Sequence, residues 1–182
     1  MQSVCVFCGS SIGVREEYRA AAREVGLQLA NRRTTLVYGG GHIGLMGVMA
    51  DAALAAGGRV IGVIPRVLFR KEIAHAGLSE LRVVETMAER KAVMGELSDA
   101  FLALPGGIGT IDELSEVWTW TQLGLQRKPS GLLNVSGYFD SFVEFVDHAV
   151  GEQFLRPTHR NLLLVDTDAV RLLDRLATAT NS

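Results

Sequence analysis

A buried strand that runs through a glycine turn into a helix is the feature that most restricts how this chain can fold. The apolar run 100–104 predicts the strand, and an amphipathic helix is predicted over 111–123. Between them lies Pro105-Gly106-Gly107-Ile108-Gly109-Thr110. Glycines let backbone N–H groups approach an oxyanion, and a helix N-terminus adds unpaired donors and the positive end of its dipole. This stretch therefore predicts an anion site at the end of a strand.

Strands and helices are predicted in alternation along the whole chain. The predicted strands are 3–8, 34–38, 59–64, 81–84, 100–104, 132–135 and 162–165. The predicted helices are 16–31, 44–56, 87–97, 111–123, 139–150 and 169–177. This alternation requires the α/β class, with an open, mainly parallel sheet and helices on both faces. We expect one domain over 1–182, which is long enough to bury its own core.

Three glycine clusters directly follow predicted strands: Gly9-Ser10-Ser11, Gly39-Gly40-Gly41 and Gly106-Gly107. The carboxyl ends of parallel strands share one edge of the sheet, where ligands bind at a switch in strand order. We therefore expect one ligand site rather than three unrelated turns, with substrate contacts from Ser10, Gly39, Gly40 and Gly41.

The run Gly39-Gly40-Gly41-His42-Ile43-Gly44 has the spacing G-x-G-x-x-G between a strand and a helix, so a dinucleotide enzyme is one hypothesis. Two observations weaken it. The fingerprint belongs after the first strand, and the acidic residue expected about 20 positions later is absent. Arg66 ends the next strand, and an arginine there could accommodate a 2′-phosphate. NADP as the cofactor therefore stays an open alternative. Close helix–strand packing is the structural alternative for Gly44 and Gly47.

The helix predicted over 87–97 begins with a basic turn. Thr86 and Glu89 form a predicted capping box. One helix face carries Met87, Arg90, Lys91 and Met94, by their spacing. This face is either a solvated basic turn or a surface that faces an anionic ligand over the glycine loops. The position of the helix after a strand favours the second interpretation.

Thr110 and Glu113 offer a similar choice. T-x-x-E is itself a capping box, yet a cap alone does not require the glycines that precede it. A carboxylate one turn into the helix lies close to any anion bound at its start. Chemistry beside a phosphate is therefore the hypothesis for Glu113.

Composition and cysteine spacing exclude several classes of protein. A net charge of -2 and 48% hydrophobic residues give no basic excess for nucleic acid or membrane surfaces. The first strand lacks the charged start of a signal peptide, so a cytoplasmic location is expected. Cys5 and Cys8 match C-x-x-C, but side chains three apart on a strand point to opposite faces. We expect neither a redox pair nor a metal site.

Three groups of residues together resemble the signature of the LOG (Lonely Guy) family: Tyr38 to Gly47, Met87 with Arg90-Lys91, and Pro105 to Glu113. The resemblance extends from Cys8-Gly9-Ser10-Ser11 to Gly137-Tyr138. Members are cytokinin riboside 5′-monophosphate phosphoribohydrolases, long mislabelled as lysine decarboxylases. The resemblance implies a Rossmann-like fold, a homodimer, and hydrolysis of the N-glycosidic bond of N6-substituted AMP. Lysine decarboxylation would need pyridoxal phosphate on a lysine, and no such site is recognisable.

Carried over by position, the resemblance implies Arg90 and Glu113 as the catalytic pair. It places the phosphate loop at Gly106, Gly107, Gly109 and Thr110, and further substrate contacts at Glu72, Lys91 and Thr119. Met87 is a further substrate-binding candidate. Ile108 stands where the family often has an aromatic residue, and Asp112 stands where glutamate is common. Neither difference affects the chemistry.

The implied reaction breaks the bond to the base through an oxocarbenium-like sugar. We assign stabilisation of C1′ to Glu113, as nucleophile or as a base that orients water. Arg90 pairs with the phosphate or orients Glu113. The products are an adenine-type base and ribose 5-phosphate, with no metal or organic cofactor. A nucleotide or molybdenum-cofactor carrier without turnover is the alternative hypothesis.

A homodimer is also expected from the residues themselves. The helices 87–97 and 111–123 carry Met94, Trp118 and Leu123, more large apolar side chains than one sheet face needs. Closed two-fold pairing is the commonest assembly of soluble proteins.

Overall fold

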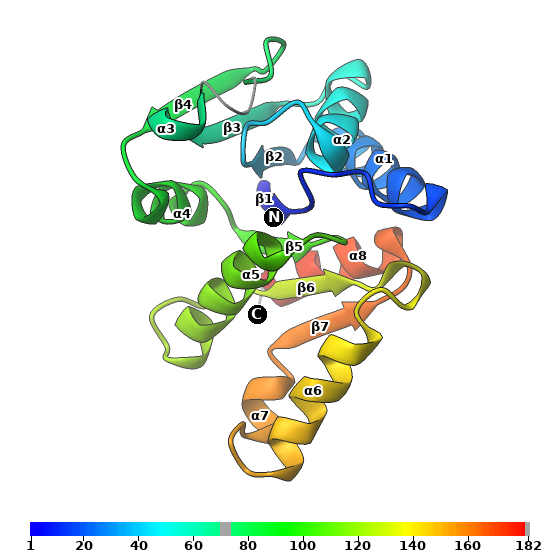
Figure 1. The fold of residues 1–182 in the computed structure, drawn as a ribbon, viewed down its shortest axis with the longest axis vertical. Helices are drawn as coiled ribbons and strands as arrows, with labels where there is room; N and C mark the ends of the chain where they lie inside the picture. Colours follow the sequence, from blue (N-terminus) through cyan, green and yellow to red (C-terminus); the bar gives the residue numbers. More distant parts are fainter. Residues whose placement is uncertain (70–73, 181–182) are drawn as a thin grey trace.

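The computed structural model describes residues 1–69 and 74–180, which form a seven-stranded sheet between two layers of helices (Figure 1). The strands are β1 (Ser3–Phe7), β2 (Thr35–Tyr38), β3 (Val60–Pro65), β4 (Glu80–Val84), β5 (Ala100–Ala103), β6 (Ser130–Leu133) and β7 (Leu163–Asp166). Their order is β4-β3-β2-β1-β5-β6-β7, and each neighbouring pair is parallel. The predicted α/β class is confirmed.

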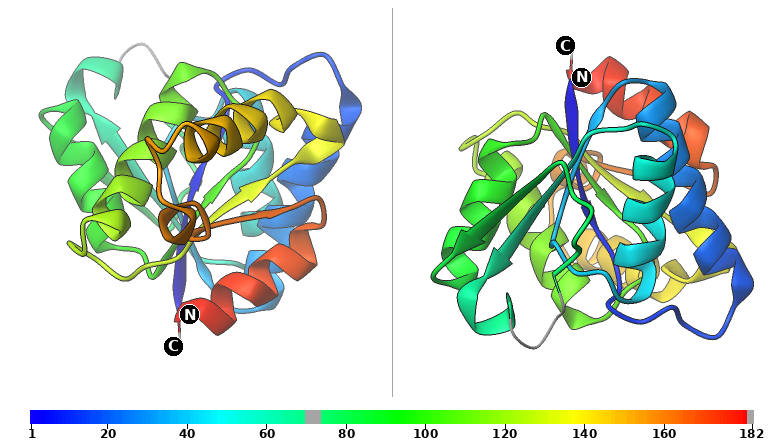
Figure 2. Two further views of the ribbon diagram at one scale, coloured as in Figure 1. Left: turned by 90° about the horizontal axis from the view of Figure 1, so that it is seen from below. Right: turned by 90° about the horizontal axis from the view of Figure 1, so that it is seen from above.

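Two groups of helices cover the two faces of the sheet, as the end-on views in Figure 2 show. One face is covered by α1 (Glu16–Asn31), α2 (Gly44–Ala55) and α8 (Ala169–Thr180), and the other by α4 (Met87–Glu96), α5 (Ile108–Gln122) and α6 (Asp140–Gly151). Alternation along β1 divides its side chains between the layers: Val4 and Val6 join the first core, and Cys5 and Phe7 the second. None of the helices described in 1–69 and 74–180 is long and apolar enough to cross a membrane.

The structure differs from the prediction at several boundaries. Strand β6 begins at Ser130, two residues before the predicted 132–135, because Gly131 weakens the apolar pattern. A Cβ at Gly131 would lie 3.2 Å from the Leu172 side chain, so glycine leaves room for α8. Helix α5 begins at Ile108, not at 111. The short helices α3 (Arg66–Phe69) and α7 (Pro157–Arg160) and the 3-10 turn η1 (Val135–Gly137) are not predicted, because so few residues give no periodic pattern.

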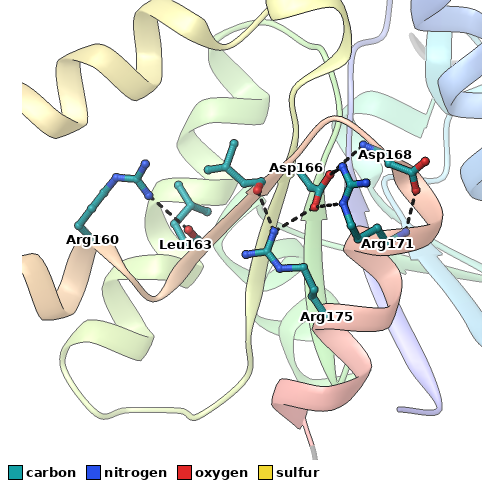
Figure 3. Close-up of polar contacts among 7 residues, drawn as sticks. Arg160, Leu163, Asp166, Asp168, Arg171 and Arg175 are labelled. Atoms are coloured by element: carbon teal, nitrogen blue, oxygen red, sulfur yellow. Dashed lines mark hydrogen bonds and ion pairs between the residues drawn. The ribbon is translucent and has the colours of Figure 1, made fainter.

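A buried carboxylate connects α8 to the end of β7 (Figure 3). Asp166 Oδ2 accepts hydrogen bonds from Arg171 Nε at 2.8 Å and from Arg175 Nη1 at 3.1 Å, and Oδ1 accepts the Asp168 N–H at 3.0 Å. The side chain of Asp166 is 6% exposed. These contacts, led by the hydrogen bond from Arg171, hold the pKa of Asp166 well below its ordinary value.

Candidate active site

The strand order reverses between β1 and β5, and the loops after these two strands meet at the carboxyl edge of the sheet. The Gly9 N–H donates to the Pro105 carbonyl oxygen at 3.0 Å and joins the two loops. Two cavities open there, and Gly9, Ser10 and Gly107 line both of them. Ligands of open α/β sheets bind at such a reversal. We call them the Arg90 cavity and the Tyr138 cavity, after one residue that lines each.

The Arg90 cavity has a volume of about 330 Å³ and gathers many of the predicted site residues. Its lining includes Ser10, Met87, Arg90, Gly107, Gly109, Thr110 and Glu113, together with Cys8, Met46, Ile108 and Asp112. These residues come from the ends of β1 and β5 and from the starts of α2, α4 and α5. Gly106 lines the neighbouring Tyr138 cavity, which has a volume of about 300 Å³.

A nearly buried ion pair lies in the wall of the Arg90 cavity. Arg90 Nη2 lies 3.5 Å from Glu113 Oε1, and the two side chains are 10% and 11% exposed. Arg90 Nη1 lies 3.9 Å from the Met87 sulfur, and Arg90 Nε is buried without a hydrogen-bond partner among the described residues. For Arg90, the solvated-turn interpretation is therefore wrong. The guanidinium is held beside the cavity, not in solvent.

The start of α5 has the features of an anion site. Gly107 is the N-cap, with extended φ and ψ of −88° and −158°. The N–H groups of Gly107, Ile108 and Gly109 make no hydrogen bond to another described residue, whereas those of Thr110 and Ile111 bond the Gly107 carbonyl oxygen. Free donors at the positive end of a helix dipole attract an anion.

The capping-box alternative for Thr110 and Glu113 is wrong. Because the helix begins three residues earlier than predicted, Thr110 lies inside it and Gly107 caps it. Thr110 instead packs on the glycine turn: a Cβ at Gly106 would lie 2.0 Å from Thr110 Oγ1. Glu113 consequently has no capping role, and its carboxylate lines the cavity.

Helix α4 begins with the predicted cap. Thr86 Oγ1 accepts a hydrogen bond from the Glu89 N–H at 3.1 Å. The Glu89 carboxylate reaches back to the Glu85 N–H at 2.8 Å rather than to Thr86, so the box is displaced by one residue. This cap starts α4 at the ligand edge and directs Arg90 toward the cavity.

Two predicted substrate-binding residues, Lys91 and Thr119, do not line the Arg90 cavity. Lys91 Nζ pairs with Glu116 at 2.8 Å and with Asp112 at 3.2 Å, and these contacts, led by the hydrogen bond to Glu116, raise its pKa. Thr119 lines a separate hollow between α5 and α6, and its hydroxyl donates to the Ser115 carbonyl oxygen. Glu72 lies outside the described residues. Contacts of Lys91, Thr119 and Glu72 with a substrate stay predictions.

The glycines after β2 pack against neighbouring residues of the site and do not line the Arg90 cavity. A Cβ at Gly39 would lie 2.1 Å from Arg90 Nη2, so any larger residue there would displace this guanidinium. The Gly40 carbonyl oxygen accepts the His75 N–H at 3.1 Å, and Gly41 forms a bridge with Ala74. These contacts give Gly39, Gly40 and Gly41 a packing role in this structure.

The rest of the G-x-G-x-x-G run also packs closely. Cβ atoms at Gly44 and Gly47 would lie 2.2 Å from the Ser10 carbonyl carbon and 1.8 Å from the His42 carbonyl oxygen. The close-packing alternative therefore describes both glycines. Arg66, the residue that left NADP open, forms an ion pair with Glu85 at 2.8 Å.

Sequence reasoning missed two features of the site. The first is Cys8, which lines the Arg90 cavity. Cys8 and Cys5 belong to the cores on opposite faces of the sheet, as their spacing on a strand predicts. Burial, followed by the Glu113 charge, raises the pKa of the Cys8 thiol, so it stays protonated. Tyr138 lines the second cavity. The position of Gly9-Ser10-Ser11 after the first strand could have indicated Cys8, but no local pattern indicates Tyr138.

The fold and site define a Rossmann-like α/β protein with an anion site and a buried cation–carboxylate pair at the switch point. A family model described as "Possible lysine decarboxylase" matches residues 46–176. "Probable cytokinin riboside 5'-monophosphate phosphoribohydrolase LOGL9" of Oryza sativa subsp. japonica is 53% identical over 95% of this chain and 76% of that protein. "Cytokinin riboside 5'-monophosphate phosphoribohydrolase LOG1" of Arabidopsis thaliana is 50% identical over 95% and 81%. The chain belongs to the LOG family of cytokinin riboside 5′-monophosphate phosphoribohydrolases.

Solved structures with a similar fold are more distant in sequence. The molybdenum cofactor carrier protein from Chlamydomonas reinhardtii has a TM-score of 0.74 at 20% identity, over 99% of this chain and 98% of that chain. The molybdenum cofactor binding protein from Rippkaea orientalis has a TM-score of 0.72 at 17% identity, over 98% and 97%. At these identities the similarity concerns the fold alone.

Proposed function

We propose that this protein hydrolyses the N-glycosidic bond of N6-substituted AMP, with plain AMP as a second candidate substrate. The products are the free base and ribose 5-phosphate. The observation that carries the proposal is the Arg90–Glu113 pair, which lies in the same cavity as the free N–H groups of residues 107–109. The names of the relatives at about 50% identity support the same reaction.

The helix geometry matches what this reaction needs. The 5′-phosphate binds the N–H groups at the start of α5, and Glu113 follows Gly109 by one turn, about 6 Å along the axis. A ribose held by its phosphate is therefore placed with C1′ near the Glu113 carboxylate. That carboxylate stabilises the electron-poor C1′ as the base leaves, and either attacks it or orients water. Arg90 orients Glu113 through their ion pair.

A base-release assay tests the proposal. Free adenine or N6-isopentenyladenine should appear when the protein is incubated with AMP or isopentenyl-AMP. Adenosine should react at least about 10²-fold more slowly, because it lacks the phosphate that positions the sugar. Equal turnover of adenosine and AMP, or no base release from any nucleotide, would contradict the proposal.

Two other functions have less support. A nucleotide or molybdenum-cofactor carrier would bind without turnover, and a carboxylate paired with a buried arginine beside the anion site has no evident use in such a protein. A lysine decarboxylase would need a lysine free to form a Schiff base. In the described part of the chain, Lys91 is ion-paired with Glu116, and Lys128 Nζ donates to the Gly95 carbonyl oxygen at 2.8 Å.

We also propose that the protein is a homodimer, but of the three residues named for this in the sequence, only Leu123 still supports the proposal. Met94 and Trp118 are buried within the protomer, at 1% and 9% exposed, so they offer nothing to a partner. Large apolar side chains that are exposed on and after α5 and α6 support the proposal instead: Leu123, Leu125, Phe145 and Phe154, at 64%, 72%, 66% and 90%. Thr119 lies in the hollow between these helices.

A further inference from the structure

The hydroxyl of Tyr138 is bonded to the turn that forms the anion site. Tyr138 Oη donates to the Gly106 carbonyl oxygen at 2.6 Å. Its ring packs edge-on against Tyr18, with centroids 5.5 Å apart, and against Phe139, with centroids 4.8 Å apart. Tyr138 is 42% exposed, but its ring has these two contacts beside it, and the hydrogen bond holds the hydroxyl at Gly106.

The backbone before Tyr138 is shaped to deliver this side chain. Ser136 and Gly137 have φ values of 50° and 72°, both in the left-handed region. For a serine this conformation is strained, and such strain persists where the surrounding structure imposes it. Asn134 imposes it here: its Oδ1 accepts the Phe139 N–H at 2.8 Å, and its amide donates to Asp140 Oδ1 at 2.7 Å.

The bond at Gly106 sets the direction of a donor on the next residue. In a trans peptide the C=O of one residue and the N–H of the following residue lie in one plane and point in opposite directions. The described chain has no cis peptide bonds. Because the Gly106 carbonyl faces Tyr138, the Gly107 N–H points away from Tyr138. That N–H makes no hydrogen bond to a described residue, and Gly107 lines the Arg90 cavity as well as the Tyr138 cavity.

We propose that Tyr138 is a positioning residue for phosphate recognition. Its hydroxyl fixes the Gly106–Gly107 peptide so that the Gly107 N–H is directed at the 5′-phosphate of the substrate. This role rests on the proposed function, since it assumes that the group bound at the start of α5 is a nucleotide phosphate. Tyr138 does not take part in bond cleavage and acts only through the peptide that it holds.

The test compares Tyr138→Phe with a matched control, Tyr18→Phe. Both variants keep the ring and remove one hydroxyl, but of these two hydroxyls only that of Tyr138 has a hydrogen bond to a described residue. Calorimetry with ribose 5-phosphate measures phosphate recognition without turnover. We expect Tyr138→Phe to weaken this affinity about three- to tenfold, the range of one net hydrogen bond, and Tyr18→Phe to leave it unchanged.

Kinetics provide a second measurement that a purely structural role would not change. In Tyr138→Phe, kcat/KM for AMP should fall by the same three- to tenfold relative to kcat/KM for adenosine. Adenosine has no phosphate, so the variant removes no contact with it. Unchanged affinity for ribose 5-phosphate in Tyr138→Phe would overturn the proposal, even if the variant melts at a lower temperature. A wild-type protein that hydrolyses no nucleotide would overturn the proposed function, while the calorimetric comparison would still decide the role of Tyr138.

Discussion

Arg90 Nη2 lies 3.5 Å from Glu113 Oε1, and the two residues come from different βα units, β4–α4 and β5–α5. A third unit contributes Gly39, whose missing side chain makes room for the guanidinium. The charge pair is therefore assembled from segments far apart in the sequence. Its geometry depends on how three loops pack at the edge of the sheet.

The substitution Glu113→Gln separates catalysis from folding. The amide keeps the shape of the side chain but cannot stabilise a cationic sugar, so turnover of AMP should fall by about 10²-fold or more. Nucleotide binding should persist, because the free N–H groups lie at residues 107–109. Asp112→Asn is the matched control, since Asp112 also lines the cavity but its carboxylate pairs with Lys91. Full activity per molecule in Glu113→Gln would remove Glu113 from the mechanism.

The substitution Gly39→Ala tests the position of Arg90 without changing a charged group. The added Cβ would lie 2.1 Å from Arg90 Nη2 and 3.2 Å from the Met46 sulfur, so the guanidinium must move. Turnover should fall by about 10²-fold, as expected for a displacement of this order in a site. Gly151→Ala is the control, because no described residue outside its own turn of helix lies within 4 Å of its added Cβ. Equal activity of the two variants would show that the position of Arg90 is not critical.

The stability of the protein should depend on Asp166 in a pH-dependent way. Its pKa is lower in the folded chain than the ordinary value of 3.8, chiefly through the hydrogen bond from Arg171. The stabilisation is therefore complete above the ordinary value and is lost as the pH falls below about 4 toward the folded-state pKa. Asp166→Asn should melt below wild type at pH 7, and the two melting temperatures should converge in acid.

Asp174→Asn is the control for this experiment. Asp174 lies on α8, the helix that carries Arg171 and Arg175, and pairs with Arg32. Its side chain is 64% exposed, and such a pair contributes little. The difference in melting temperature between Asp166→Asn and wild type should shrink in acid. If it stays constant from pH 7 to about pH 3, ionisation of Asp166 is not the cause of the lower stability of the variant.

Light scattering should give a mass near twice the 19.7 kDa of the chain. Phe145→Glu should lower that mass toward one chain, because a charge in an apolar interface loses its hydration. Val14→Glu should leave the mass unchanged, since Val14 is 99% exposed and precedes α1 on the other side of the sheet. A monomeric wild type would contradict the homodimer.

The fold could be predicted where side chains show a clear period. Helix α1 has the predicted bounds, 16–31, because Tyr18, Ala22, Val25 and Leu29 repeat along one buried face. The sequence pattern predicts the start of α5 three residues too late, because Gly107 and Gly109 are typical of a turn. In the structure Gly107 is the N-cap of this helix. Glycine has no propensity strong enough to distinguish these cases, so tertiary packing decides.

The candidate site could be predicted as far as the glycine loops after β1 and β5 and the charged residues Arg90 and Glu113. Arg90 and the 107–110 turn follow strands, and a parallel sheet brings such segments to one edge. The pairing of Lys91 with Glu116 and Asp112 depends on how α4 packs against α5, which no local pattern specifies. The contact of Tyr138 with Gly106 depends on a left-handed serine, a conformation that sequence rarely indicates.

The hydrogen bond from Gly9 to Pro105 lies at the boundary between two halves of the sheet. One half contains β1 to β4, and the other contains β5 to β7. A nucleotide bound in the Arg90 cavity, as proposed, would contact both halves and so would connect them reversibly. Ligand at 100 times its dissociation constant adds about 2.7 kcal/mol to the stability of the folded state. Protein with bound nucleotide should therefore resist separation of the two halves. Its resistance to unfolding should increase with the concentration of substrate.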